Sequence, residues 1–303
     1  MIVHSDEINQ YLDDFYNGRI SMGLGIDVPY LDNRLRYKQG QFNVILGLPN
    51  VGKTDWAIWY FWKLSQKHGL THIAWTGENK AGTSVRRLIQ YKTGKYINQM
   101  PLSEVYRHST EIQQYFKFVS NKGFYTPEQL FDLFRSNKTH NCFIDPFTGL
   151  NKKHEWASNI DFLNDCRNHC SQTNQTIYLS QHPNAEGQRR ILNKGEYSGY
   201  IDSPMPSHAE GGAGFFNRAD DFIVVHRYVG HPVLGKITQI GIRKIKETET
   251  GGDPTDIAAP LDFDFNNGLG YKEWGASPLA NETNLNGLHK GGYAEQVEEE
   301  PPF

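Results

Sequence analysis

Cysteine, long apolar runs and net charge are all scarce in this sequence, and each scarcity excludes a class of protein. Three cysteines in 303 residues do not make a disulfide framework, so we interpret them as buried free thiols. No apolar run approaches the roughly 20 residues of a membrane-spanning helix. Residues 1–7 lack the basic and apolar stretches of a signal peptide. We therefore expect a cytoplasmic protein with no membrane partner, in the host cytoplasm if it is viral.

The charge and composition are those of an ordinary packed domain. A formal net charge of -3 does not indicate a nucleic-acid-binding protein, although such binding needs a local basic track rather than a basic average. A hydrophobic fraction of 38% and an aromatic fraction of 13% are typical of a protein with a sizeable core. The length suits one large α/β domain or two small ones.

Short apolar runs alternate with helical patterns along the first two thirds of the chain. Strands are predicted at 42–46, 72–76, 124–125, 141–144 and 176–180. Helices are predicted over 53–67, 84–91, 127–134 and 156–171. This alternation predicts an α/β fold with a mostly parallel central sheet and helices on both faces. Two later strands, at 222–227 and 236–246, have little helix between them and predict antiparallel C-terminal additions.

Three segments are predicted. Residues 1–25 contain a short amphipathic helix over 4–18, capped by Ser5, with apolar residues at helical spacing. Residues 26–274 form the α/β domain. Residues 275–303 are polar and rich in glycine and asparagine, with a glutamate-rich end, and predict a disordered acidic tail.

The clearest motif is a phosphate-binding P-loop of the form G-x-x-x-x-G-K-[ST]. It follows the first predicted strand and opens a helix, where glycines let backbone N–H groups surround a phosphate. Lys53 is expected to reach the terminal phosphates and Thr54 to bind Mg²⁺ through its hydroxyl. The residues predicted to bind the nucleotide here are Gly47, Leu48, Pro49, Asn50, Val51, Gly52, Lys53 and Thr54.

Two carboxylates lie where the chemistry of a P-loop enzyme needs them. Asp145 ends the apolar run 141–144, the Walker B pattern, and is predicted to hold the Mg²⁺ shell. Glu78 follows the strand at 72–76, at the edge of the sheet that faces the ligand. Two interpretations of Glu78 stay open: a group that activates water, or an ordinary surface glutamate. The cofactors predicted are ATP or a dNTP, with Mg²⁺.

The order of these motifs resembles the motor domain of DnaB-type replicative helicases, a family of RecA-fold ring ATPases with phage and mitochondrial members. The resemblance covers about residues 22–271. It is carried by the P-loop and by Thr76-Gly77-Glu78-Asn79, Arg86-Arg87-Leu88, Ile144-Asp145, Leu179-Ser180-Gln181-His182, Gly211-Gly212-Ala213-Gly214 and Asp220-Asp221-Phe222. The resemblance implies a RecA-like P-loop NTPase without a primase domain. It also implies a homo-oligomer, a hexameric ring, that moves along single-stranded DNA and unwinds duplex.

The resemblance implies roles for individual residues. Glu78 takes the position of the catalytic base, and Gln181 or His182 that of the γ-phosphate sensor, for which we favour Gln181. Residues 183–210, called here the candidate DNA loop, take the place of the loop that contacts single-stranded DNA. Phosphate contacts are expected from Asn184, Arg189, Arg190 and Lys194. The other interpretation is a solvated flexible loop.

In the family a neighbouring subunit supplies a K-x-R pair to the nucleotide, and this chain departs from that pattern. Lys244 takes the lysine place and Lys246 the arginine place, and a lysine lacks the bidentate fork of arginine. Arg243 lies on the opposite face of a regular strand and reaches the site only after a local bulge. Phe265 falls where family members stack an aromatic ring on the base, although it fits a core phenylalanine equally well.

Both ends of the chain suggest partners. The helix over 4–18 either docks onto the next subunit, as the resemblance implies, or packs on its own. The tail, which ends in Phe303, either contacts a DNA polymerase or another replisome protein, or keeps the protein in solution. The alternative to a helicase is a RecA-type ATPase of another role, such as a recombinase, a helicase loader or a regulatory ATPase, that binds DNA without unwinding it.

Overall fold

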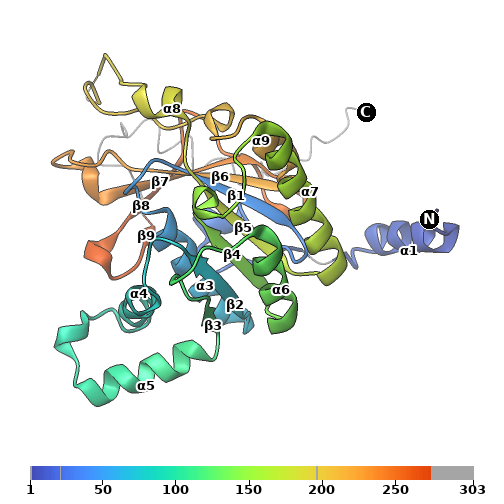
Figure 1. The fold of residues 1–303 in the computed structure, drawn as a ribbon, viewed down its shortest axis with the longest axis horizontal. Helices are drawn as coiled ribbons and strands as arrows, with labels where there is room; N and C mark the ends of the chain where they lie inside the picture. The colour runs from blue at the N-terminus through green and yellow to red at the C-terminus, as the bar shows by residue number, and fades with distance from the viewer. Residues whose placement is uncertain (1, 21, 196, 274–303) are drawn as a thin grey trace, which may run out of the picture.

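The computed structural model describes residues 2–20, 22–195 and 197–273, and the predicted tail over 275–303 lies outside them. One nine-stranded sheet runs through the described part, in the order β3-β2-β4-β5-β1-β6-β7-β8-β9 (Figure 1). The strands are β1 Phe42–Leu46, β2 His72–Thr76, β3 Phe116–Phe118, β4 Asn141–Asp145, β5 Thr176–Gln181, β6 Asp221–His226, β7 Ile237–Lys244, β8 Leu261–Asp264 and β9 Lys272–Glu273.

The strand directions confirm the predicted fold class. β3, β2, β4, β5, β1 and β6 are mutually parallel, and β7, β8 and β9 add to them in antiparallel order. Antiparallel neighbours need no crossover connection, so no long helix separates these strands.

Helices cover both faces of the sheet. The helices of the described residues are α1 Ser5–Tyr16, which stands away from the sheet, and α2 Pro29–Asp32, α3 Lys53–His68, α4 Ala81–Thr93, α5 Leu102–Gln113, α6 Pro127–Asn137, α7 Trp156–Thr173, α8 Ala185–Arg189, α9 Gly214–Arg218 and α10 Thr248–Gly251. One core lies between the sheet and α3, α4 and α5, and a second lies between the sheet and α6, α7 and α9. Successive residues of β1 alternate between them: Val44 enters the second core and Ile45 the first.

Several local predictions need correction. The strand predicted at 124–125 is absent, since those residues form an irregular segment before α6. β3 and α5 lie in a stretch where no element was predicted. α4 begins at Ala81 rather than at 84, and β7 ends at Lys244 rather than at 246. The cap of α1 is His4, whose side chain accepts from the Asp6 N–H, and Ser5 is already helical.

Other predictions are confirmed. Pro127 opens α6 after Thr126, whose hydroxyl accepts from the Gln129 N–H. The three cysteines are free thiols, and all of them are buried. Among the described residues, no helix combines the length and the apolar character that a membrane crossing requires.

The N-terminal helix α1 projects from the body of the molecule (Figure 1). None of its residues is buried, and more than half of the surface of Ile8, Tyr11, Leu12 and Phe15 is exposed. In the described part of the chain its apolar face therefore lacks a cover, which leaves docking onto another molecule as the interpretation to pursue.

Candidate functional site

The predicted P-loop joins the end of β1 to the start of α3, and its glycines are there for steric reasons. A side chain at Gly47 would place a Cβ 2.4 Å from the backbone oxygen of Val225. Gly52 caps α3 in the left-handed region, with φ of 97°. Such a backbone is open to glycine and strained for other residues. The loop conformation that the motif predicts is therefore built here by close packing at one end and by a positive φ at the other.

Lys53 points back into this loop. It is only 6% exposed, and its Nζ donates to the carbonyl oxygens of Gly47, at 2.8 Å, and Leu48, at 3.0 Å. Burial lowers the pKa of Lys53 to about 8, although the carboxylates of Asp145 and Glu78 oppose the fall. A phosphate would offer the ammonium group stronger, charged acceptors than these carbonyls. The geometry therefore suits Lys53 to the role that the motif predicts.

Thr54 and Asp145 come together from α3 and β4. The Thr54 hydroxyl donates to Asp145 Oδ2, and the Asp145 side chain is buried at the carboxyl end of its strand. Protein sites for Mg²⁺ commonly use one or two such oxygens, with phosphates and water completing the octahedron. Over the described residues, no group of three or more His, Cys, Asp or Glu side chains is placed to hold a metal by itself. The donor set therefore fits Mg²⁺ carried by a nucleotide.

A largely polar cavity of about 270 Å³ opens beside the P-loop. Lys53, Thr54, Glu78 and Asp145 all line it. The backbone before Glu78 is fixed to β4, because the N–H of Gly77 donates to the Asp145 backbone oxygen at 2.7 Å, and Glu78 itself is exposed. The structure thus brings four of the predicted catalytic and metal-binding residues to one cavity.

Two arginines near this cavity are absent from the predicted site. Arg87 of α4 and Arg227, directly after β6, line the cavity, and the guanidinium carbon of each lies within 6 Å of the Phe265 ring centroid. Arg227 also donates to the Asn50 carbonyl oxygen at 2.7 Å. The signal that points to Arg227 is its position at the carboxyl end of a parallel strand, the edge where α/β sheets bind ligands.

The two sensor candidates point in different directions. Gln181 is fully buried, and its Nε2 donates to the Glu210 carbonyl oxygen at 2.6 Å. His182 Nδ1 lies 3.2 Å from Lys53 Nζ. Burial and the Lys53 charge lower the pKa of His182, which favours a neutral ring that accepts from the ammonium group. Of the pair, His182 contacts Lys53, and Gln181 is hydrogen-bonded to the end of the candidate DNA loop.

Lys244 and Lys246, which are predicted to act on a neighbouring subunit, lie near the end of the sheet opposite to the P-loop. Lys244 of β7 pairs with Phe222 at the start of β6, whereas the P-loop follows the end of β1, which is parallel to β6. A strand of six residues is about 16 Å long, so the two ends of β6 are about that far apart. Lys246 therefore lies far from the P-loop of its own chain.

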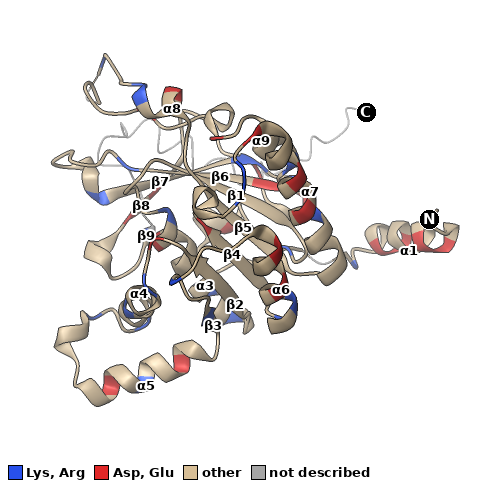
Figure 2. Ribbon diagram, viewed as in Figure 1, with Lys and Arg blue, Asp and Glu red and all other residues tan. Residues whose placement is uncertain are grey.

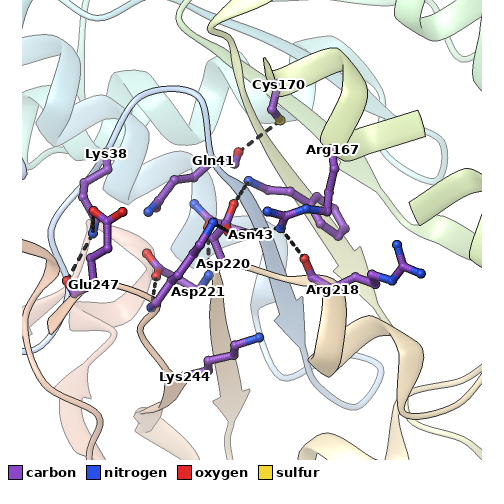
Figure 3. Close-up of polar contacts among 12 residues, drawn as sticks. Lys38, Gln41, Asn43, Arg167, Cys170, Arg218, Asp220, Asp221, Lys244 and Glu247 are labelled. Carbon is purple, nitrogen blue, oxygen red and sulfur yellow. Dashed lines mark hydrogen bonds and ion pairs between the residues drawn. The ribbon is translucent and has the colours of Figure 1, made fainter. Parts of the chain in front are cut away.

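Each of these cations has a partner at that edge. Lys246 Nζ lies 3.0 Å from Asp220 Oδ1. Arg167 contacts the same oxygen at 3.0 Å, and Figure 3 labels both Arg167 and Asp220. Lys244 donates to the Phe216 carbonyl oxygen at 3.0 Å. A register shift between Phe222 and Ile223 marks the bulge that was considered for Arg243, whose Nη1 donates to the Asp256 carbonyl oxygen at 3.0 Å.

The candidate DNA loop is more ordered than the solvated interpretation assumes. Asn184 caps α8 by accepting from the Gly187 N–H, and Arg190 forms an ion pair with Asp202 at 3.1 Å. Arg189 and Lys194 are exposed. The described part of the loop therefore presents three exposed cations on a folded base, and one of them, Arg190, is paired with Asp202.

Comparison with protein-family models and with curated proteins gives no match. Solved structures do match. The ATPase domain of G40P aligns with a TM-score of 0.69 and 14% identity, covering 90% of this chain and 100% of that one. A DnaB-like replicative helicase, solved in a study of its interactions with primase, aligns at 0.65 and 15% identity, covering 89% and 67%.

A KaiC-like protein from Pyrococcus horikoshii OT3 aligns with a TM-score of 0.53 and 14% identity, covering 84% of this chain and 98% of that one. Identities this low compare folds rather than activities. With the P-loop between β1 and α3, this chain has the RecA-like fold of the DnaB-type helicase ATPase domains.

Proposed function

We propose that this protein is a ring-forming, NTP-driven DNA helicase that moves along single-stranded DNA and separates duplex. The observation that carries the proposal is the meeting of Lys53, the Thr54–Asp145 pair and Glu78 around one cavity. The similarity to the fold of DnaB-type ATPase domains supports a motor of the replicative, phage-like kind. The protein then acts in the cytoplasm.

Each residue of the cavity has a part in hydrolysis of ATP or a dNTP. Thr54 and Asp145 would hold Mg²⁺, which when bound would neutralise charge on the phosphates. Lys53 binds the terminal phosphates, and Glu78 orients and deprotonates the attacking water. The Phe265 ring, with Arg227 against it, offers the base a stacking surface.

We propose that a second copy of the chain adds a further cation to those that line the cavity and that this cation acts on the transferring phosphoryl group. Lys246, on the opposite edge of the sheet, faces the nucleotide of the next subunit in a head-to-tail ring, for which we propose six subunits. Arg243 is the second candidate for this role. Asp220 holds Lys246 until then, and its hydrogen bonds from Phe42, Lys246 and Arg167 lower its pKa against the opposing effect of burial.

Helix α1 closes the ring. Its exposed apolar face includes Ile8, Leu12 and Phe15, and its remaining surface is acidic, with no lysine or arginine in the helix (Figure 2). We propose that residues 1–25 dock this face onto the neighbouring subunit. Helix α5 of that subunit offers Leu102 and Tyr106, each 64% exposed, as apolar partners.

DNA lies against the candidate DNA loop. Arg189 and Lys194 neutralise phosphates without reading bases, and Asn184 and the exposed Arg190 add contacts beside them. We propose also that the acidic tail over 275–303 contacts a DNA polymerase or another replisome protein through Phe303.

Strand displacement on a forked duplex tests the helicase. Wild type should displace the strand in the presence of NTP and Mg²⁺, and Lys53→Ala should not, because it loses its phosphate contact. Hydrolysis stimulated by single-stranded DNA without any displacement would refute unwinding.

The same observations allow a second function, a RecA-type ATPase that binds DNA without unwinding, such as a recombinase, a loader or a regulatory ATPase. The similarity to a KaiC-like protein and the lysine at the usual arginine position favour it. Electron microscopy with NTP and single-stranded DNA separates the two, because a recombinase forms filaments and a helicase closed rings.

A further inference from the structure

Three tyrosines join the candidate DNA loop to the turn after β6. The Tyr197 ring stacks on Tyr228, with centroids 4.5 Å apart and planes 22° apart. Tyr200 meets Tyr228 edge-on at 6.2 Å. Leu234 and Ile237 are buried beneath this contact. The loop is thus anchored by aromatic packing to the β6–β7 turn.

Tyr197, Tyr200 and Lys194 belong to one hairpin, which follows Arg189 at the end of α8. Ile191 pairs with Ile201, and the N–H of Asp202 donates to the Arg190 carbonyl oxygen at 2.7 Å. The N–H of Leu192 donates to the Tyr200 carbonyl oxygen at 3.0 Å. A DNA phosphate that binds Arg189 or Lys194 therefore contacts the same structural unit that holds Tyr197 and Tyr200.

The other end of this connection reaches the nucleotide. Tyr228 directly follows Arg227, which donates to the Asn50 carbonyl oxygen at 2.7 Å and lies over the Phe265 ring. One peptide bond thus separates the residue that anchors the hairpin from a residue that touches both the P-loop and the base-stacking surface.

A cavity lies between the hairpin and the P-loop beside this connection. This cavity of about 300 Å³ has Leu48 and Pro49 on the P-loop side and Tyr200 and Ile201 on the hairpin side. Arg227 and Tyr228 line the same cavity and bridge its two walls. Arg227 and Tyr228 are therefore placed between the hairpin side and the P-loop side of this cavity.

We propose that Tyr197 and Tyr200 are positioning residues that couple DNA contact to the nucleotide site through Tyr228 and Arg227, separately from the strand-end residues Gln181 and His182. The inference rests on the proposed function. DNA bound to the hairpin shifts Tyr228 and with it the contact of Arg227 with Asn50. Coupling of this kind is reciprocal, so bound nucleotide also changes the affinity for DNA.

The test compares Tyr197→Ala with Tyr197→Phe. Three quantities are measured for each: NTP hydrolysis without DNA, hydrolysis at saturating single-stranded oligonucleotide, and oligonucleotide affinity by fluorescence anisotropy with and without a non-hydrolysable NTP analogue. Tyr197 lines neither cavity, so Tyr197→Ala should keep the kcat and KM measured without DNA. Its stimulation by DNA should fall by about fivefold or more, the usual size of coupling between sites. Tyr197→Phe keeps the ring and should restore stimulation.

Tyr200→Ala removes the edge-on contact with Tyr228 instead of the stacked one. This second variant keeps the proposal testable if Tyr197→Ala unfolds the hairpin. Lys194→Ala is the matched control on the same hairpin. It should weaken DNA affinity and yet reach full stimulation at saturating oligonucleotide, because the anchor is intact.

The outcomes separate the two levels of the proposal. A wild type that DNA neither binds nor stimulates would overturn the proposed function together with the coupling. A wild type stimulated by DNA, with both alanine variants stimulated equally, would overturn the coupling alone. If stimulation in Tyr197→Ala recovered fully at higher oligonucleotide concentration, the tyrosine would be a DNA contact and the inference would be wrong.

Discussion

The buried charge of Lys53 makes a prediction about stability as well as about binding. Replacement by methionine keeps a long unbranched side chain and removes the ammonium group. Burial holds the Lys53 pKa at about 8, against an ordinary value of 10.5. At about 1.4 kcal/mol per pH unit, this difference means that the charged form costs the folded protein about 3 kcal/mol at pH 7. Methionine also loses the hydrogen bonds from Lys53 to Gly47 and Leu48. This loss costs about 1–2 kcal/mol and offsets part of the stability gained by removing the charge. Lys53→Met should therefore raise the free energy of unfolding by about 1–2 kcal/mol at pH 7 while abolishing NTP binding.

The sign of the pH dependence follows from the same numbers. Between pH 8 and pH 10.5 the unfolded chain holds a proton on Lys53 that the folded chain has lost, so the wild-type protein gains stability as the pH rises through this window. The advantage of Lys53→Met should shrink above pH 8 and reverse before pH 10.5, because the wild type gains about 3 kcal/mol over this window, more than the advantage at pH 7. Urea denaturation of both proteins at several pH values, without nucleotide, measures it. A variant less stable than wild type at pH 7, or a difference that does not change with pH, would refute the assignment of a strained buried charge.

Three further outcomes are expected. Glu78→Gln should bind NTP with near wild-type affinity and lose about 10²–10⁴ in turnover, the usual contribution of a general base; a turnover near wild type in a coupled phosphate-release assay would remove Glu78 from this role. Gly47→Ala should lose about 1–3 kcal/mol of stability and most NTP affinity, because its Cβ would lie 2.4 Å from the Val225 carbonyl oxygen; calorimetric titration with NTP and a denaturant series measure the two losses, and unchanged values would contradict the packing argument. Lys246→Ala and Lys53→Ala should each be inactive alone and regain hydrolysis when mixed, since about a quarter of head-to-tail interfaces then pair an intact P-loop with an intact Lys246; no recovery in the mixture would argue against action between subunits.

The parallel core of the fold was predictable because its signals are local. A short apolar run such as 42–46, followed by a glycine and a helix, specifies a buried strand, and the P-loop spacing places Lys53 and Thr54 without tertiary information. The segment between β2 and α6 was harder. β3 has only three residues and gains its stability by pairing with β2, and α5 leaves Leu102 and Tyr106 exposed, so neither has a strong pattern of its own.

The site residues also fall into those with local sequence signals and those that depend on tertiary contacts. Asp145 and Glu78 could be identified from the sequence because each lies at the end of a predicted strand. The carboxyl ends of parallel strands lie at the edge of the sheet where ligands bind. Arg227 also ends a strand, yet its contacts with Asn50 and Phe265 join residues far apart in the sequence, and only the folded chain brings them together. The choice between Gln181 and His182 likewise depends on side-chain direction, which a strand-end dipeptide leaves open.

Residue types and spacing were enough to establish a phosphate-binding loop, a parallel sheet and a short list of carboxylates, because each depends on neighbours within a few positions. The opposite placement of Lys246, the uncovered face of α1 and the tyrosine anchor of the candidate DNA loop depend on strand order and on contacts between distant segments. The antiparallel return of β7 carries Lys246 to the far edge of the sheet, and the packing of Tyr197 on Tyr228 turns a polar loop into a structured one. Both come from long-range packing, whose free energy no short stretch of sequence contains.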